Sequence, residues 1–316
     1  MSEHRHLVPP RLDEFRRYYV RTIRPELLRL DVRRRRILRG IFVSLLLIAA
    51  AAVVFASTDL GFLNLLLIVP VVFYVGHLYY RLEKFRQAFK PAVVQLILNF
   101  LNEGLNFRSL TYDPNKPILR DRFERSGLFR PDAASYRAED YIRGIVGEMA
   151  FEMGETYVRE LSPASNRIQL VFSGLFVHAV FNEPVRDQVA VWPRRQRRRL
   201  KRVIDSYVSQ GGRVADVEIH NADFREVFAV YAKKGSVVKD IITPPMQDAL
   251  LDFHRQTGRD LYFSINRKDL FIGLAHDYDL LEPNLFRSNV KYTLIRRFYD
   301  DITLMLGVIA DFDQNR

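Results

Sequence analysis

Two apolar stretches separated by three polar residues constrain this chain more than any other feature. Ile41 to Ala56 contains no formal charge, and after Ser57-Thr58-Asp59 the apolar sequence resumes and runs from Leu60 to Tyr80. The second stretch would rise about 30 Å as a helix, which matches the hydrocarbon core of a bilayer. We therefore predict a transmembrane helical hairpin over residues 39–80. The first stretch is shorter, and whether it crosses fully stays open.

Two other interpretations of the apolar stretches are weaker. A helical hairpin buried in a soluble protein normally shows a polar face, and these stretches have none. A cleaved signal peptide has a short basic prefix, whereas the first forty residues here hold twelve arginines and five acidic residues.

Basic residues flank the predicted hairpin on both sides, whereas the connecting turn has none. The flanking set is Arg33, Arg34, Arg35, Arg36 and Arg39 before the first stretch, and Arg81, Lys84, Arg86 and Lys90 after the second. Because positive residues concentrate on the cytoplasmic side of a membrane, we expect both termini to be cytoplasmic.

The segment before the hairpin, residues 1–38, is basic and has one helical apolar stripe. The stripe has spacings of three and four and comprises Leu12, Phe15, Tyr19, Ile23, Leu27 and Leu30. We favour a cytoplasmic helix that packs on the downstream domain. An interfacial helix that lays its apolar face on the bilayer is the alternative.

Residues 81–316 contain no repeat or Gly/Ser linker, and we interpret them as one cytoplasmic domain. We expect a helix over 81–102 and another over 246–256. Short runs of β-branched and aromatic residues predict strands from Tyr136 onward and at 167–172, 175–181, 188–192, 213–219, 227–232, 260–265 and 269–274.

The C-terminal region carries the cleanest helical period of the chain. Its apolar stripe is Val290, Leu294, Phe298, Ile302, Met305 and Ile309. Such a helix packs across a sheet, so we predict a mixed, largely antiparallel α+β domain that ends in a C-terminal helix and follows the transmembrane hairpin.

Composition and motifs exclude several kinds of chemistry. The chain has no cysteine, which excludes disulfides, thiolate metal sites and a cysteine nucleophile. It also lacks the Walker A, GxGxxG, GxSxG, HExxH and EF-hand patterns. We therefore expect no cofactor and no metal site, and we favour a function without catalysis. Seven histidines are scattered, and only His276-Asp277-Tyr278-Asp279 groups an imidazole with carboxylates. We favour a surface turn there over a catalytic or metal site.

A second concentration of positive charge lies between residues 194 and 202. It comprises Arg194, Arg195, Arg197, Arg198, Arg199, Lys201 and Arg202, in a chain of formal net charge +11. The run can be a solvated surface or a patch for anionic lipid or an acidic protein partner. Nucleic acid is disfavoured, because the run lacks interleaved aromatic residues.

The same segments resemble a bacterial membrane-protein family known as domain of unknown function 3137. The resembling residues are Phe172-Ser173-Gly174-Leu175-Phe176, Phe181-Asn182, Phe224 to Tyr231, Ile242 to Met246, Phe263-Ser264, Leu270 to Ile272, Glu282-Pro283 and Leu285, with Glu139 to Ile142, Gly144 and Gly147. The similarity extends from the N-terminal helix to about Ser288. It implies an inner-membrane protein, with a LemA-like membrane protein as a candidate partner, and it supplies no catalytic residues.

The leading functional hypothesis is a membrane-anchored cytoplasmic interaction or scaffold module without catalysis. The alternative is a membrane-surface enzyme, hydrolase-like, with a site near His276. A lipid-contacting or transport accessory whose hairpin oligomerises is a third hypothesis.

Overall fold

The computed structural model describes residues 12–57, 61–103, 107–129, 133–162, 166–184, 186–276 and 282–314. These residues form two compact units. The helical unit comprises residues 12–97 and 282–298, and the sheet unit comprises residues 98–276 and 299–314.

The helical unit begins with one continuous helical path. Helix α1 (Leu12–Tyr18) leads through one π-helical segment, η1 (Tyr19–Ile23), into α2 (Arg24–Ser57). Pro25 lies at the second position of α2, directly after the π-helical segment, and it does not break the path.

The predicted N-terminal stripe is buried within the helical unit. Phe15 and Tyr19 contact the ring of Tyr292, with centroid distances of 6.4 and 5.1 Å. The hydroxyl of Tyr18 donates to the carbonyl of Leu96 at 3.2 Å. This packing uses the apolar face inside the protein, so an interfacial helix that offers this face to lipid is not what the structure shows.

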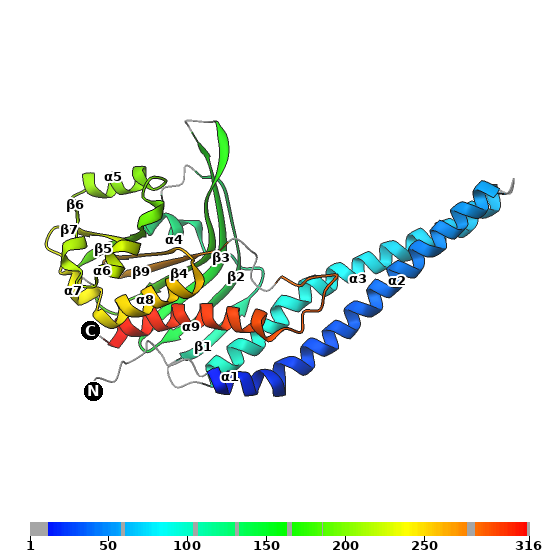
Figure 1. Cartoon of the computed structure of the whole chain (residues 1–316), viewed down its shortest axis with the longest axis horizontal. Helices are drawn as coiled ribbons and strands as arrows, with labels where there is room; N and C mark the ends of the chain where they lie inside the picture. The colour runs from blue at the N-terminus through cyan, green and yellow to red at the C-terminus, as the bar shows by residue number, and fades with distance from the viewer. Residues whose placement is uncertain are drawn as a thin grey trace. The chain divides into compact units, whose positions relative to one another are not determined.

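Helices α2 and α3 (Gly61–Asn102) run side by side along much of their length (Figure 1). At Gly40 an added Cβ would lie 3.0 Å from Leu78, so a glycine permits the close approach of the two helices there. Pro70 and Pro91 lie inside α3. The boundaries predicted at residues 38 and 80 both fall within these continuous helices.

The transmembrane character of the hairpin stays a prediction. Among the described residues, no helix combines the length and the apolar character needed to cross a membrane. The predicted spans include residues 51 and 54–68, whose side chains lie outside the described part of the chain.

The described residues of the sheet unit form a nine-stranded antiparallel sheet in the order β1-β2-β3-β4-β9-β8-β5-β7-β6. The strands are β1 (Phe107–Asp113), β2 (Ala133–Val146), β3 (Met149–Ser162), β4 (Arg167–Val180), β5 (Gln188–Pro193), β6 (Gly212–Val214), β7 (Phe228–Lys233), β8 (Leu261–Asn266) and β9 (Asp269–Ala275). The predicted α+β class and antiparallel sheet are confirmed.

Helices cover both faces of this sheet (Figure 1). One face packs under α4 (Arg120–Arg125) and α5 (Lys201–Ser209), and its core includes Phe123, Phe176 and Trp192. The other face packs against the C-terminal helix α9 (Tyr292–Gln314), whose Phe312 contacts Phe181 and Phe263 at centroid distances of 6.1 and 5.5 Å. The remaining helical elements are η2 (Arg194–Gln196), η3 (Asp216–Glu218), α6 (Ala222–Val227), α7 (Val238–Ile241) and α8 (Pro244–Thr257).

A glycine turn ties the C-terminal helix to the sheet. Gly147, between β2 and β3, has φ of +57°, and an added Cβ would lie 1.8 Å from a carboxylate oxygen of Asp313. The next peptide N–H, of Glu148, donates to both oxygens of Asp313 at 3.2 Å. The turn therefore requires glycine for both its conformation and its close contact with α9.

Candidate functional site

A pocket of about 400 Å³ opens on the sheet unit, on the face of β1 to β4 that also contacts α4. Its lining combines apolar side chains with a few polar and charged ones. The lining residues are Ser109, Thr111, Arg122, Tyr141, Arg143, Gly144, Ile145, Ala150, Phe151, Glu152, His178 and Val180. This composition and size are those of small-molecule sites in proteins.

The lining of this pocket includes an imidazole, His178, that lies between two carboxylates. His178 Nδ1 lies 3.0 Å from Glu152 Oε1, and His178 Nε2 lies 2.6 Å from Asp269 Oδ1. Glu152 on β3 is the direct cross-strand partner of His178 on β4, and Asp269 on β9 lies opposite Val180. The strand register therefore brings the three side chains to one face of the sheet. The ring of His178 also stacks on Phe271 at 4.9 Å.

Glu152 is the centre of the polar network. Its Oε1 also accepts from Arg122 Nε at 3.0 Å, and its Oε2 accepts from the hydroxyl of Tyr141 at 3.0 Å. The hydrogen bond from His178, with those from Tyr141 and Arg122, lowers the pKa of Glu152 to about 2 against the opposing effect of burial. Burial and the Glu152 carboxylate raise the pKa of Tyr141 to about 12.

The contacts of His178 favour a pocket that binds a ligand over one in which His178 transfers a proton to or from it. Both ring nitrogens of His178 lie within hydrogen-bond distance of a carboxylate oxygen, at 3.0 and 2.6 Å. While both contacts persist, neither ring nitrogen is open to a substrate. A general base needs a free nitrogen within reach of the proton it takes.

Sequence reasoning placed the only candidate reactive cluster at His276, and the structure gives that residue a different environment. His276 is 6% exposed, and its peptide N–H donates to the carbonyl of Ser173 at 2.9 Å. Asp277, Tyr278 and Asp279 lie outside the described residues. The ring of His276 is therefore buried in the sheet unit, rather than presented at a surface turn.

One cluster of three acidic residues in the described part of the chain has the oxygen spacing of a cation site. Oxygens of Glu139, Asp140 and Glu155 lie within 4.8 Å of one another. Asp140 also accepts from the hydroxyl of Tyr112 at 2.5 Å. Burial and the nearby Asp140 raise the pKa of Tyr112 well above its ordinary range.

The basic run at residues 194–202 is partly neutralised within the sheet unit. Arg194 pairs with Asp216 at 2.6 Å, Arg195 with Asp260 at 2.6 Å, and Arg202 with Glu160 at 3.1 Å. Arg199 donates to the carbonyl of Val171 at 3.2 Å. The side chains of three exposed residues make no hydrogen bond or ion pair with the described part of the chain, namely Arg197, Arg198 and Lys201. The surface available to an anionic partner is therefore smaller than the run itself.

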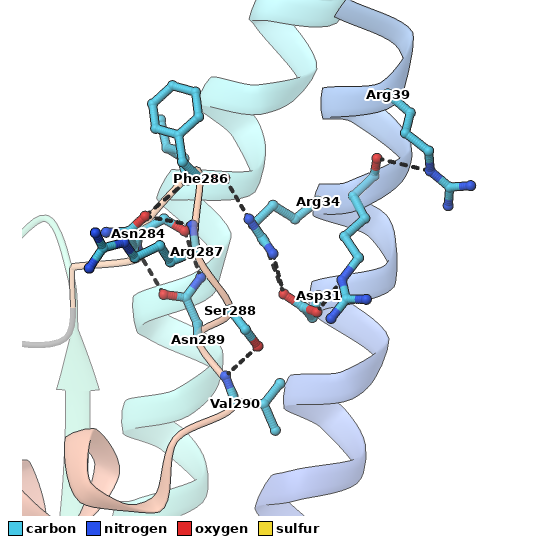
Figure 2. Close-up of polar contacts among 11 residues, drawn as sticks. Asp31, Arg34, Arg39, Asn284, Phe286, Arg287, Ser288, Asn289 and Val290 are labelled. Carbon is cyan, nitrogen blue, oxygen red and sulfur yellow. Dashed lines mark hydrogen bonds and ion pairs between the residues drawn. The ribbon is translucent and has the colours of Figure 1, made fainter. Parts of the chain in front are cut away.

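The basic residues beside the predicted hairpin also divide into two groups. Arg34, 3% exposed, pairs with Asp31 at 2.8 Å and donates to the carbonyl of Leu285 at 2.7 Å (Figure 2). Arg35 shares the same Asp31 at 2.8 Å. Arg34 is thus an internal contact of the helical unit, not a flanking surface charge. The exposed members of the predicted set are Arg33, Arg35, Arg36, Arg39, Arg81, Lys84 and Arg86.

Comparison with known proteins finds one family match for this chain. Residues 170–314 match the family described as protein of unknown function (DUF3137), so the resemblance drawn from the motif residues is confirmed over that range. The match covers β4 to α9 and leaves Glu139 to Gly147 and the helical N-terminus outside it. No curated protein and no solved structure matches the chain.

Sequence reasoning missed Glu152 and Asp269 and counted His178 only among scattered histidines. Glu152 lies 26 positions from His178 in the sequence, and Asp269 lies 91 positions from it. A weak signal was available, because acidic and imidazole side chains are unusual on adjacent, otherwise apolar strands. No local motif joins them.

Proposed function

We propose that this chain is a membrane-anchored interaction module, with α2 and α3 as the membrane hairpin. The supporting observation is the exposure of large apolar side chains on both helices. Leu45, Leu46 and Leu47 are each 54–55% exposed although successive helical residues point about 100° apart, and on α3 Phe73 is 77% exposed. Apolar side chains exposed around so much of a helix indicate an apolar surrounding, and a bilayer supplies one.

The flanking charges orient the proposed anchor. Arg33, Arg36 and Arg39 on α2 and Arg81 on α3 are exposed near the same end of the helix pair. The positive-inside rule then favours both termini and the sheet unit on the cytoplasmic side. In this proposal the resemblance to the DUF3137 family favours a bacterial inner membrane. An acidic membrane-associated partner, a LemA-like protein among them, or anionic lipid would meet Arg197, Arg198 and Lys201.

The anchoring proposal predicts where the chain fractionates and which side its end faces. We expect the full chain to stay with the membrane pellet after alkaline carbonate washing, which removes peripheral proteins. A reporter enzyme that functions only in the cytoplasm is expected to be active when it is fused after Arg316. A reporter that functions only on the outer side of the membrane is expected to be inactive there. Release by carbonate, or activity of the fused reporter only on the outer side, would contradict the proposal.

A segment from the C-terminal half supports contact with the membrane interface. In the strap, residues 282–291 of the helical unit, Phe286 is 83% exposed. Its backbone is fixed, since Asn284 Oδ1 accepts from the N–H groups of Phe286 at 3.0 Å and Arg287 at 2.7 Å, and Asn289 closes the turn onto Asn284 (Figure 2). A large apolar side chain fixed in solvent indicates a contact surface.

The strap is attached to α2 close to the proposed anchor. Arg34 bonds the carbonyl of Leu285, and Ile41 lies seven residues further along the same helix, a rise of about 10 Å. A second attachment is the contact of Arg86 on α3 with both oxygens of Glu282 at 3.0 Å. Phe286 is therefore held near the level where an aromatic side chain meets lipid headgroups.

The variant Phe286→Trp tests this placement. In the full chain reconstituted with bilayers, we expect lipid brominated near the headgroup to quench the added tryptophan fluorescence more strongly than lipid brominated at the chain end. The native Trp192 is fully buried and gives the background to subtract. The matched control is Val217→Trp, because Val217 is 82% exposed in the sheet unit. Equal quenching of both variants would contradict an interfacial role for Phe286.

A further inference from the structure

The pocket on β1 to β4 has hydrogen-bond donors to offer a ligand but few acceptors. Both oxygens of Glu152 are occupied by Arg122, His178 and Tyr141. Arg143 Nε donates to the hydroxyl of Thr111 at 3.3 Å, and the terminal nitrogens of its guanidinium make no hydrogen bond with the described residues. A ligand that fits this pocket therefore accepts hydrogen bonds rather than donating them.

Arg143 is a cation of the pocket lining whose guanidinium pairs with no carboxylate of the described residues. Glu152 and Asp269 face His178, and Glu152 also faces Arg122. Asp121 lies 3.6 Å from Arg122 but also pairs with Arg125 at 3.3 Å on the same helix. Arg143 makes no ion pair with the described residues. The guanidinium of Arg143 can therefore pair with an added anionic group, and guanidinium groups bind carboxylates in bidentate geometry.

The rest of the pocket is apolar and partly open. Ile145 and Val180 are 36% and 37% exposed, and Ala150 between them is also exposed. Large apolar side chains left open beside a cation suit a ligand with an apolar body and an anionic end.

The strand that completes the pocket is locally irregular. The β1–β2 register shifts between Arg108 and Thr111, and Ser109 in that bulge has φ of +57°. Bulges re-aim side chains and are frequent beside binding sites. Here the bulge belongs to the pocket lining through Ser109, and the lining also includes Thr111, whose hydroxyl accepts from Arg143 Nε.

We propose that this pocket binds a small organic monocarboxylate with an apolar body. The carboxylate pairs with the guanidinium of Arg143, and the body lies against Ile145, Ala150 and Val180. The hydrogen-bonded network of Glu152, His178 and Tyr141 keeps that part of the pocket lining rigid and does not react with the ligand. This site is independent of the membrane anchor.

The test uses the purified full chain and cyclohexanecarboxylate as the probe, titrated by calorimetry at neutral pH. We expect saturable binding, and at least tenfold weaker binding of cyclohexanecarboxamide, which keeps the body and removes the charge. Acetate, which keeps the charge and removes the body, is also expected to bind at least tenfold more weakly. Absence of saturable binding by the carboxylate, or equal binding of the amide, would overturn the proposal.

Two variants locate the binding within the pocket. Arg143→Gln is expected to weaken binding at least tenfold, whereas the control Arg137→Gln, on the same strand with a side chain 73% exposed, binds like the parent. Ala150→Trp fills the pocket and leaves Arg143 in place, and it is expected to cause the same loss. Parental affinity in both Arg143→Gln and Ala150→Trp would overturn the assignment. Tighter binding of cyclohexyl phosphate than of the carboxylate would overturn the choice of a monocarboxylate.

Discussion

Replacing Arg259 with methionine is expected to lower the free energy of unfolding by about 3–5 kcal/mol, the usual cost of removing one member of a buried ion pair. Asp301 on α9 has a side chain 1% exposed, and Arg259 has one 12% exposed. Arg259 Nη1 donates to Asp301 Oδ2 at 2.8 Å, and Nη2 donates to Oδ1. Methionine keeps much of the aliphatic volume but leaves the buried carboxylate without this bidentate partner.

Chemical denaturation of the parent and two further variants checks this result. Arg255→Met removes an ion pair with Asp223 in which the side chains are 54% and 60% exposed. We therefore expect this variant to lower the free energy of unfolding by less than about 1 kcal/mol. The double variant Arg259→Met with Asp301→Leu removes both buried charges and is expected to recover most of the loss. Equal, small losses for Arg259→Met and Arg255→Met would show that burial does not determine the strength of the Arg259 pair.

Replacing Glu152 with glutamine is expected to destabilise the sheet unit by about 3 kcal/mol at neutral pH. The carboxylate has a pKa of about 2 in the folded chain against an ordinary value of 4.5, and each unit is worth about 1.4 kcal/mol. Its side chain is 19% exposed, so solvent screens the interaction only in part. Glutamine keeps the size of the side chain and removes the charge that Arg122 and His178 share.

The difference in the free energy of unfolding between the parent and Glu152→Gln is expected to change with pH in one direction. Because folding lowers the pKa of Glu152, its stabilisation is complete above about pH 4.5 and disappears as the pH falls toward about 2. The stability gap between parent and Glu152→Gln is therefore expected to be constant from pH 7 to about 5.5 and to narrow below 4.5. Denaturant titrations at a series of pH values measure it.

A carboxylate outside the network provides the control. Glu148, which is exposed and accepts from Asn182 at 3.0 Å, precedes β3. Glu148→Gln is expected to change stability by less than about 0.5 kcal/mol at every pH. A gap for Glu152→Gln that is small at pH 7, or that widens on acidification, would show that the network of Glu152 and His178 does not stabilise the fold.

Much of the secondary structure follows from local pattern. The helix predicted at 246–256 is α8, and the apolar stripe from Val290 predicts α9. The strands predicted at 188–192 and 269–274 are β5 and β9. These elements are regular, so the period of their apolar residues matches their geometry.

The predictions failed where the chain departs from a regular period. The strands predicted at 167–172 and 175–181 are one strand, β4, that continues through Gly174. The strand predicted at 213–219 is wrong beyond Val214, because the chain turns into the short 3-10 helix η3. Strand β1 was missed, since the bulge at Ser109 interrupts its alternation.

The sequence by itself determined the α+β class, the apolar helix pair and the places where positive charge concentrates. These properties depend on neighbours a few residues apart, so a period or a run is enough to reveal them. Only the tertiary structure decided that Arg34 is paired and buried while Arg33 is exposed, and that Glu152, His178 and Asp269 meet beside a pocket. The reason is that an ion pair needs atoms within about 4 Å, and strand register sets that distance between residues far apart in the chain.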